Sequence, residues 1–235
     1  RSNSSPSGWS NNFFKFLVFN FFLRRANQII TNSKEFSKEI NKKFSVKCKT
    51  ILNPFDFSYI KKKSIEKIKF PFFNKKTLKI INIGRLTDQK DQLTFIKAID
   101  IVSKKKNVRA IIIGKGSAYN KLNNLIKIHK LKNSIKLIGY QNNPFKYLKK
   151  ADIFVLTSTF EGHPNVLVEA QYLKKFIISS DCPTGPKEIL NNGKFGDLFK
   201  VGDYKSLSKL ILNYKKNRTY SKKITLGYNS LNQYN

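Results

Sequence analysis

Two carboxylates that flank a glycine and a proline form the part of the sequence richest in possible chemistry. Glu161 and Glu169 are separated by seven residues, and Gly162 and Pro164 lie between them. Glycine permits an unusual turn, and we expect Pro164 at the first position of a helix, where backbone N–H groups stay free to face an anion. We expect the free N–H groups to be those of Asn165, Val166 and Leu167. The segment therefore predicts a cleft in which both carboxylates accept hydrogen bonds from sugar hydroxyls near a phosphate, although Glu161 as a simple helix cap is the alternative.

A site that combines carboxylates with phosphate needs cations, and an earlier turn offers two. Gly84 is followed by Arg85 and, five positions later, by Lys90, with Asp88 and Asp91 close by. Arg85 and Lys90 together could neutralise a diphosphate, whose negative charge grows as its bond to a leaving sugar breaks. Taken alone, such a pair is also typical of an ordinary solvated loop.

A second glycine turn, Gly114-Lys115-Gly116, precedes another predicted helix and is compatible with the close approach of a nucleotide. The full dinucleotide-binding pattern needs a third glycine where Tyr119 stands. The turn therefore does not support a dinucleotide enzyme, and a plain strand-to-helix connection is the alternative interpretation.

The elements that must position these residues alternate regularly along the chain. Short apolar runs predict strands at Leu78–Ile83, Val108–Ile113, Ile135–Ile138, Ile153–Leu156 and Phe176–Ser179. Amphipathic segments between them predict helices at Asp91–Lys104, Ala118–Lys130, Asn143–Lys150 and Asn165–Leu173. Strands that alternate with helices predict an α/β fold with a doubly wound, Rossmann-like parallel sheet. Ligands bind at the carboxyl ends of such strands, where each of the turns described above begins.

The first 75 residues also alternate helix-like and strand-like segments. Gln28–Thr31 predicts a short strand, and Ser33 is a suitable N-cap for a helix over Lys34–Phe44. The segment Lys61–Lys76 is rich in lysine and lacks a strong periodicity, so we interpret it as a linker and expect a domain boundary near residue 75.

The run Phe13–Leu23 is strongly apolar but short, and Lys15 and Asn20 interrupt it. Its apolar residues recur at helical spacing, so we expect a helix packed in a core, with a membrane anchor as the alternative. No apolar run approaches the roughly 18 to 20 residues needed to cross a bilayer.

The composition is strongly basic, with 46 Lys and Arg against 14 Asp and Glu and a formal net charge of +32. Residues 1–75 carry +12 and residues 76–235 carry +20, so no single basic arm accounts for the excess. The cations are 40 Lys and only 6 Arg, whereas nucleic-acid readers favour Arg for bidentate contacts. We attribute the charge mainly to compositional bias and expect no nucleic-acid partner; attraction to anionic membranes or phosphorylated substrates is the alternative. Two cysteines, Cys48 and Cys182, are too few for a disulfide framework or a zinc site and fit a reducing, cytoplasmic setting.

The carboxylate segment resembles the signature of retaining glycosyltransferases of family four, which have the GT-B architecture of two facing Rossmann-like domains. The resemblance extends to Gly84–Asp91, Ile113–Gly116, Leu137–Gly139, Ala151–Leu156 and Asp181–Ile189, and covers roughly residues 77–212. Asn27–Ser33 and Leu52–Asp56 resemble the end of the acceptor domain and the crossover into the donor domain. The resemblance implies a remnant of the acceptor domain at 1–55, a crossover at 56–76, a donor-binding domain at 77–216 and a helical tail at 217–235. The chain begins at Arg1 and contains no Met, so we expect most of the acceptor domain upstream of it.

By this resemblance the donor is a UDP- or GDP-linked sugar, and the reaction needs neither a metal nor another cofactor. Arg85 and Lys90 would neutralise the diphosphate, Glu161 would touch the donor sugar, and Glu169 would hold the ribose hydroxyls. The other residues that the resemblance assigns to donor binding are Gly84, Gly114, Gly116, Gly139, Tyr140, Gly162, His163, Asn165, Val166 and Leu167. His163 departs from the family, where an apolar residue is more usual, and either a contact with the sugar or a neutral variation explains it.

The loop Asp181–Pro186 resembles the form found in enzymes that extend surface polysaccharides or lipid-linked oligosaccharides, often with N-acetylhexosamine donors. The implied acceptor is a glycan on polyprenyl diphosphate at the inner face of the cell membrane. Two alternatives remain open: another GT-B enzyme such as a nucleotide-sugar epimerase or a phosphorylase, and a non-enzymatic basic module that binds membranes or nucleic acid.

Overall fold

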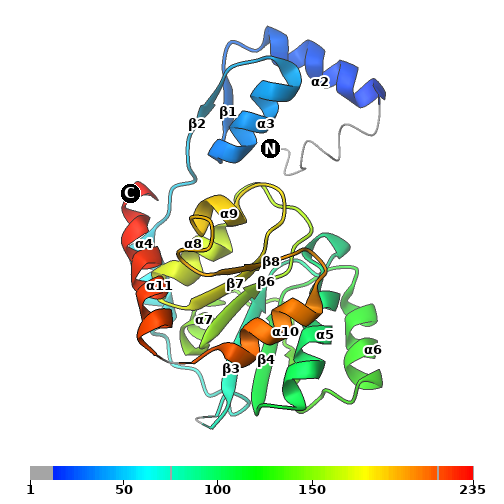
Figure 1. Cartoon of the computed structure of the whole chain (residues 1–235), viewed down its shortest axis with the longest axis vertical. Coiled ribbons are helices and arrows are strands. Elements are labelled where there is room, and N and C mark those ends of the chain that lie inside the picture. The colour runs from blue at the N-terminus through cyan, green and yellow to red at the C-terminus, as the bar shows by residue number, and fades with distance from the viewer. Residues whose placement is uncertain (1–12, 75, 216, 235) are drawn as a thin grey trace.

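The computed structural model describes residues 13–74, 76–215 and 217–234, which form a small lobe and a large lobe joined by a crossover segment (Figure 1). The small lobe contains α2 (Phe13–Arg25), β1 (Ile29–Thr31), α3 (Lys34–Phe44) and β2 (Cys48–Thr50). The two strands are parallel, with Ile29 opposite Cys48, and α3 supplies the crossover that a parallel pair requires. The lobe is thus one βαβ unit preceded by a helix. Residues 1–12 of the predicted acceptor-domain remnant lie outside the described residues.

Local sequence signals explain where α3 begins and ends. The Ser33 hydroxyl accepts a hydrogen bond from the Phe36 N–H at 3.2 Å, which confirms the predicted N-cap. At the other end Ser45 adopts a left-handed conformation, and its N–H donates to the Asn41 carbonyl at 2.9 Å. The short strand predicted just before this helix is also confirmed.

The apolar run near the start is helical, but its predicted burial in a core is wrong for this structure. Phe14 is 78% exposed and Phe22 is 65% exposed, and α2 contains no buried residue. Phe16 stacks on Phe44 of α3, at 5.3 Å between ring centroids. Apolar side chains lie on several sides of α2, so the adjacent α3 covers only part of its surface. Among the described residues, no helix is long and apolar enough to cross a membrane.

The crossover is more ordered than the lysine-rich sequence predicts. Its helix α4 (Phe57–Ser64) is capped by Asp56, whose carboxylate accepts from the Tyr59 N–H at 2.8 Å. Ile60 is buried, whereas Lys61 and Lys62 on the next positions are exposed. Residues 61–64 of the predicted linker therefore belong to a helix, and the interpretation of Lys61–Lys76 as a linker between the lobes stays a prediction. Ile60 and Ser64 are the buried residues of this helix, and lysines occupy the three positions between them. The apolar periodicity is therefore too weak to predict a helix.

The large lobe is built on a parallel sheet, and its strands confirm the predicted α/β class. They are β3 (Leu78–Ile83), β4 (Val108–Ile113), β5 (Ile135–Leu137), β6 (Ile153–Leu156), β7 (Phe176–Ser180) and β8 (Asp197–Phe199). The strands lie in the order β5-β4-β3-β6-β7-β8, and every neighbouring pair is parallel. This is the doubly wound order of Rossmann folds, with the direction of winding reversed between β3 and β6.

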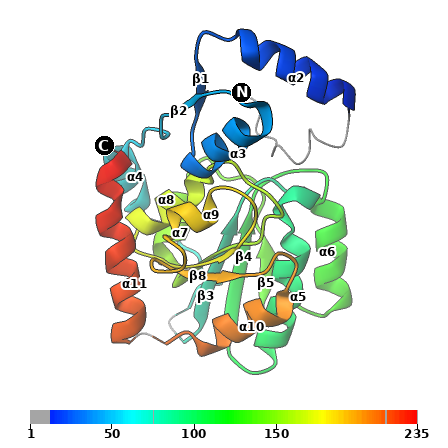
Figure 2. The ribbon, with the colours of Figure 1, turned by 45° about the horizontal axis from the view of Figure 1, so that its top comes forward.

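Helices cover both faces of this sheet, as Figures 1 and 2 show. One face packs against α5 (Gln92–Ser103), α6 (Tyr119–Ile128) and α10 (Tyr204–Asn213). The other packs against α4, α7 (Phe145–Lys150), α8 (Asn165–Tyr172) and α9 (Pro186–Ile189). Neighbouring strand residues alternate between the two cores: Ile80 faces the first and Ile81 the second. The chain ends in α11 (Arg218–Asn229) and the 3-10 helix η2 (Ser230–Tyr234), which pack beside α8.

Element boundaries differ from prediction where capping residues intervene. The helix predicted from Asp91 begins at Gln92, because Asp91 caps it and accepts from the Thr94 N–H at 3.2 Å. Likewise α7 begins at Phe145, whose N–H donates to the Asn143 side chain at 3.1 Å. The strands β2 and β8 have three residues each and were not predicted, because so short a run carries little periodicity.

Candidate functional site

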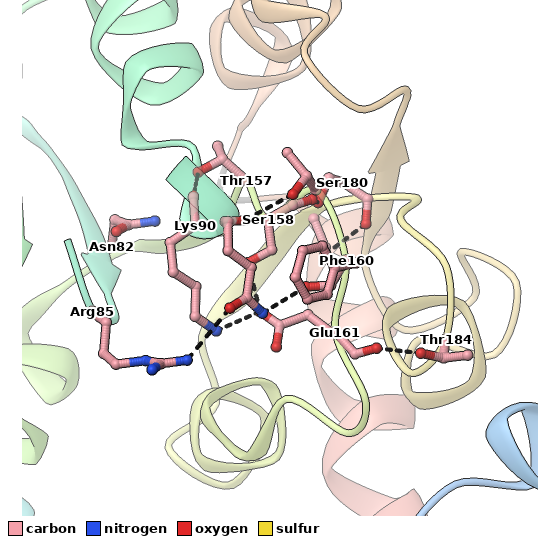
Figure 3. Close-up of polar contacts among 12 residues, drawn as sticks. Asn82, Arg85, Lys90, Thr157, Ser158, Phe160, Glu161, Ser180 and Thr184 are labelled. Atoms are coloured by element: carbon pink, nitrogen blue, oxygen red, sulfur yellow. Dashed lines mark hydrogen bonds and ion pairs between the residues drawn. The ribbon is translucent and has the colours of Figure 1, made fainter. Parts of the chain in front are cut away.

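The loops that follow β3 and β6 meet at the centre of the sheet. These strands are neighbours, yet the chain leads from β3 to β4 on one side and from β6 to β7 on the other. The connections therefore run to opposite sides of the sheet, and in open α/β folds ligands bind in the crevice beyond the carboxyl ends of the strands at such a reversal point. The turn 84–91 and the carboxylate segment, both singled out in the sequence, lie at this crevice (Figure 3).

An ion pair joins the two loops. Lys90 ends the 3-10 helix η1 (Asp88–Lys90), and its Nζ lies 2.5 Å from Oε1 of Glu161. The side chains are only 15% and 8% exposed. Ser158 donates its hydroxyl to the same carboxylate oxygen at 2.5 Å. The structure thus brings together a predicted cation and a predicted carboxylate, and adds a buried serine that was not among the predicted site residues although it lies only three residues before Glu161.

Further hydrogen bonds fix the two loops to each other. Thr157 Oγ1 donates to the Lys90 carbonyl at 2.8 Å, and the Thr159 N–H donates to the Gln89 carbonyl at 2.8 Å. The Gln89 side chain donates in return to the Phe160 carbonyl at 3.0 Å. Because backbone groups are bonded on both sides of the ion pair, Lys90 is held in place before any ligand arrives. Sequence analysis did not assign Gln89 or Thr157 a role, because their partners are about 70 residues away.

Arg85 differs from Lys90 in its surroundings. Its side chain is exposed, and Nη2 lies 3.4 Å from Oε1 of Gln89. Figure 3 shows its guanidinium on the same side of the cluster as the Lys90 ammonium. The arrangement presents one cation fixed by a carboxylate and one that can reach outward to an anion.

Two of the three glycines in the neighbouring turns, Gly114 and Gly116, are required by close packing of the backbone. A Cβ atom on Gly114 would lie 1.8 Å from the Gly84 carbonyl oxygen, and one on Gly116 would lie 2.3 Å from the Leu86 carbonyl oxygen. The turns after β3 and β4 therefore pack backbone against backbone, which no larger residue allows. Nucleotide binding by Gly84, Gly114 and Gly116 remains a prediction beside this packing requirement.

The helix α8 starts at Asn165 as its predicted range has it, but Pro164 precedes the helix instead of occupying its first position. Pro164 is the N-cap with an extended backbone, and the helix begins at Asn165. The Leu167 N–H donates to the Pro164 carbonyl at 2.9 Å, so the expectation that this N–H is free is wrong. The N–H groups of Asn165 and Val166 have no acceptor in the described part of the chain. An anion at this helix start would therefore meet two backbone donors rather than three.

Glu169 lies farther along α8 and is partly buried. In the described residues its carboxylate has no hydrogen-bond partner. Burial without a partner raises the pKa of Glu169 from 4.5 to about 7, because the charged form loses its hydration. A carboxylate without a partner can accept hydrogen bonds from a ligand. These bonds would replace the hydrogen bonds that water makes to an exposed carboxylate.

His163 is turned away from solvent. Only 8% of the residue is exposed, and Nε2 lies 3.1 Å from the hydroxyl of Tyr234 at the end of the chain. Burial lowers the pKa of His163, so the ring is neutral at pH 7. Gly162, the residue before it, has no side chain that could cover this loop from solvent. A contact of His163 with the sugar remains a prediction, while the structure shows a packing role against Tyr234.

Tyr140 marks another corner of the crevice. It follows β5 and Gly139, which adopts a positive φ of 71°, and the tyrosine is 61% exposed. The Lys115 ammonium lies 5.3 Å from the centroid of its ring. The edge predicted to meet the base therefore offers an exposed aromatic ring. The described residues contain no group of three or more His, Cys, Asp or Glu side chains able to hold a metal ion.

The doubly wound lobe with this crevice places the chain in the GT-B class of folds. The structure of Anabaena HepE in complex with UDP and glucose matches 97% of this chain and 64% of that chain, with a TM-score of 0.81 and 20% identity. A glycosyltransferase structure from Rickettsia africae matches 95% and 63%, with a TM-score of 0.81 and 16% identity. At these identities the likeness shows the fold.

The chain belongs to the family described as Glycosyl transferases group 1, which matches residues 63–230. This confirms the resemblance to family four. An uncharacterized glycosyltransferase of Methanocaldococcus jannaschii is 40% identical over 74% of this chain and 44% of its own length. A Campylobacter jejuni protein, named as an N-acetylgalactosaminyltransferase acting on a diphospho-undecaprenol-linked saccharide, is 31% identical over 82% of this chain and 52% of its own length. The chain thus spans about half the length of these relatives.

Proposed function

We propose that this chain is the donor-binding part of a retaining glycosyltransferase. It would transfer a sugar, an N-acetylhexosamine, from a UDP- or GDP-linked donor to a growing surface polysaccharide or lipid-linked oligosaccharide. The observation that carries the proposal is the Lys90–Glu161 ion pair, held at the point where the winding of the sheet reverses. A cation beside a carboxylate at this position provides partners for the diphosphate and for the sugar hydroxyls of one ligand.

The geometry suggests how the donor would lie. Its diphosphate would lie between Arg85, Lys90 and the N–H groups that begin α8, since these are the positive groups around the crevice. Glu169 would accept hydrogen bonds from the ribose hydroxyls, and the base would reach the edge at Tyr140. The sugar would then lie over Glu161, whose carboxylate Ser158 and Lys90 hold in position.

Transfer breaks the bond between the anomeric carbon and the diphosphate oxygen. The nucleoside diphosphate leaves with the electron pair of that bond, and Arg85 and Lys90 stabilise the added negative charge. The acceptor hydroxyl attacks from the same face that the diphosphate leaves, which retains the anomeric configuration, and its proton passes to the departing phosphate. Fixed charges stabilise an oxocarbenium-like transition state, without a covalent enzyme intermediate.

The names of relatives support the proposed sugar and acceptor. Besides the Campylobacter jejuni protein above, a Staphylococcus aureus relative is named as a poly(ribitol-phosphate) α-N-acetylglucosaminyltransferase and is 30% identical over 60% of this chain. A polyprenyl-diphosphate acceptor would place the enzyme in the cytoplasm, peripherally bound at the inner face of the cell membrane. The net charge of +32 would favour approach to anionic lipid there.

The small lobe is the basis for the proposed partner, the remainder of an acceptor domain of the same protein. The start of its α3 contacts the 185–188 segment of the large lobe, and the exposed apolar side chains of α2 provide a surface that further structure of that domain would cover. Such a cover would account for the exposure of α2 in this chain. The domain boundaries drawn from the resemblance stay a prediction.

Isothermal titration of the chain with UDP, GDP and their N-acetylhexosamine conjugates tests the proposal. We expect weak binding and little turnover by this chain alone, because the proposed remainder of the acceptor domain would supply most of the acceptor pocket. Arg85→Ala and Lys90→Ala should each weaken binding about tenfold, or about 1.4 kcal/mol. Lys132→Ala, an exposed lysine in another loop, is the matched control. Salt-dependent binding to random DNA that nucleotide sugars do not displace would favour the non-enzymatic alternative.

A second test uses the full-length protein. Glu161→Gln should abolish transfer while circular dichroism shows a retained fold, because the amide keeps the packing but not the charge. Robust transfer by the present chain would contradict the requirement for a separate acceptor domain.

A further inference from the structure

A carboxylate of the large lobe binds the start of a helix in the small lobe. Glu188, on α9, accepts hydrogen bonds from the Ser33 hydroxyl at 2.8 Å, the Lys34 N–H at 3.1 Å and the Glu35 N–H at 3.0 Å. Ser33 Oγ also accepts from the Phe36 N–H, so the hydroxyl links Glu188 to the cap of α3. An anion at this position is favourable because the N-terminus of α3 carries partial positive charge.

A second carboxylate crosses the same boundary in the opposite direction. Glu35, in the first turn of α3, accepts from the Gly185 N–H at 3.1 Å. Gly185 has a φ of 88°, and a Cβ atom there would lie 2.6 Å from Cδ of Pro164 and 2.7 Å from the Gly162 carbonyl oxygen. The point that Glu35 holds is therefore packed directly against the carboxylate loop of the candidate site. We call the two residues Glu35 and Glu188 the carboxylate latch.

The latch is continuous with the backbone around Glu161. Thr184 donates its hydroxyl to the Glu161 carbonyl, and the Glu161 N–H donates to the Pro183 carbonyl at 3.3 Å. Figure 3 shows Thr184 reaching Glu161 from the neighbouring loop. A shift of the 183–185 loop would therefore move the Glu161 backbone through both its carbonyl group and its N–H group.

Other contacts of the small lobe and the crossover fall on the same region. The Asn53 side chain donates to Oδ1 of Asn165 at 2.7 Å, at the start of α8. Asn32 Oδ1 lies 3.9 Å from the position that a Cβ atom on Gly162 would take. Both figures of the whole chain place the small lobe over α8 and α9, away from the opposite end of the sheet. The boundary between the lobes is therefore made on the loops that carry the proposed chemistry.

Attraction between opposite charges does not explain the carboxylate latch. Its two carboxylates repel each other, and burial followed by the charge of Glu188 raises the pKa of Glu35 despite the Gly185 hydrogen bond. Hydrogen bonds from N–H and hydroxyl groups, rather than ion pairs, hold these carboxylates in place. Such bonds are directional, so they specify the angle between α3 and the 183–185 loop as well as their proximity.

We propose that Glu35 and Glu188 are positioning residues that set the orientation of the small lobe and, through the 183–185 loop, align Glu161. The structural part of this proposal stands without the proposed function, and only its kinetic consequence depends on glycosyl transfer. Neither residue needs to touch the donor.

Distance measurement between spin labels tests the structural part on the chain as it is, without nucleotide. Labels at Lys38→Cys on α3 and Lys132→Cys in the large lobe, both exposed positions, report the lobe orientation. Cys48→Ser removes one native thiol, and Cys182 can remain because burial raises its pKa to about 12. Glu188→Gln and Glu35→Gln should each broaden the distance distribution, since an amide NH₂ cannot accept the bonds a carboxylate accepts.

Glu39→Gln is the matched control, because it removes the same charge from the same helix without contact to the other lobe. It should leave the distribution unchanged. A distribution that stays unchanged in Glu188→Gln and also in Glu35→Gln would overturn the proposal. Thermal unfolding shows whether each variant is folded, and Glu35→Gln serves if Glu188→Gln is not.

The kinetic consequence is measured on the full-length protein. We expect Glu188→Gln to lower kcat at least tenfold while the KM for the donor changes less than threefold, because the proposed donor contacts all lie in the large lobe. A change confined to the donor KM would contradict the positioning role. Failure of the wild-type protein to bind any nucleotide sugar would instead refute the proposed function and leave the distance test standing.

Discussion

Lys90 and Glu161 are both charged and mostly buried, and their ion pair compensates each charge for its lost hydration. With side chains 15% and 8% exposed, either group alone would lose hydration without compensation. Their situations are not equal, however, because Ser158 still donates to Glu161 when Lys90 is absent. Lys90 also has a flexible stem that can move its ammonium toward solvent when Glu161 is replaced.

We therefore predict that Lys90→Ala lowers the free energy of unfolding by about 2 to 4 kcal/mol and that Glu161→Gln lowers it by about 1 kcal/mol. Urea denaturation at pH 7 measures both values. Lys121→Ala is the control, because its partner Asp88 is 93% exposed and a surface pair of this kind contributes less than about 1 kcal/mol. Equal losses for Lys90→Ala and Lys121→Ala would contradict the structural importance of the buried pair.

Glu169 makes the free energy of unfolding depend on pH. Its pKa is about 7 in the folded chain and near 4.5 when unfolded, so the folded state holds its proton more tightly. Stability is unaffected below pH 4.5, falls as the pH rises toward about 7, and stays reduced above that by on the order of 3 kcal/mol. Glu169→Gln should therefore stabilise the nucleotide-free chain at pH 8 by up to this amount and have little effect at pH 4.5. Denaturation series at the two pH values measure the difference.

The same substitution should act in the opposite direction on binding. A carboxylate that accepts from ribose hydroxyls must be charged, so the UDP affinity of the wild-type chain should rise about tenfold between pH 6 and pH 8. Titration of Glu169→Gln over the same range corrects for the ionisation of the nucleotide phosphate itself. Equal UDP affinities of the variant and the wild type at pH 8 would show that Glu169 does not bind the ligand.

At the scale of elements, the turns after β3 and β4 have to be considered together. Gly114 leaves no room for a Cβ atom beside the Gly84 carbonyl, and both turns are part of the sheet edge that forms the crevice. Gly114→Ala should lower the free energy of unfolding by more than about 3 kcal/mol, because backbone must move to relieve the overlap.

Gly202→Ala separates this overlap from simple conformational strain. Gly202 also has a positive φ, of 77°, but a Cβ atom there would meet nothing within 4 Å. Its cost should stay near 1 to 2 kcal/mol, as measured by the same thermal or urea unfolding. A similar cost at both positions would show that close packing of the two turns is unimportant.

Which elements the sequence could predict follows from their length and burial. The runs Leu78–Ile83 and Val108–Ile113 are mostly apolar and have buried residues toward both faces of the sheet, so their boundaries were predicted to the residue. The three-residue strand β8 begins with Asp197, which pairs with Lys223 from a distant helix and gives no local signal. For α2, helical spacing indicated the helix but could not indicate whether another element covers it.

At the scale of the molecule, the contacts that join the lobes could not be predicted from the sequence at all. Ser33 and Glu188 are 155 residues apart, and neither belongs to a periodic pattern that would reveal the pairing. The candidate site was more predictable, since Arg85, Lys90 and Glu161 each follow a recognisable strand and parallel strands end at one edge. The contacts of Glu161 with Lys90, Ser158 and Thr184 depend on side-chain packing across loops, which spacing does not encode.

The net charge of +32 also belongs to the whole molecule, because basic residues are spread over both lobes. If the excess is compositional, its main physical effect is self-repulsion of the folded state, which salt screens within a Debye length of about 8 Å at 0.15 M. Raising NaCl from 20 to 300 mM should therefore raise the melting temperature, by roughly 3 °C for each kcal/mol of repulsion relieved. Scanning calorimetry with NaCl and with KCl separates screening from binding of one ion. A melting temperature that falls with salt would mean that attractive pairs such as Lys90–Glu161 outweigh the excess charge, and the lysines would then need a specific structural explanation.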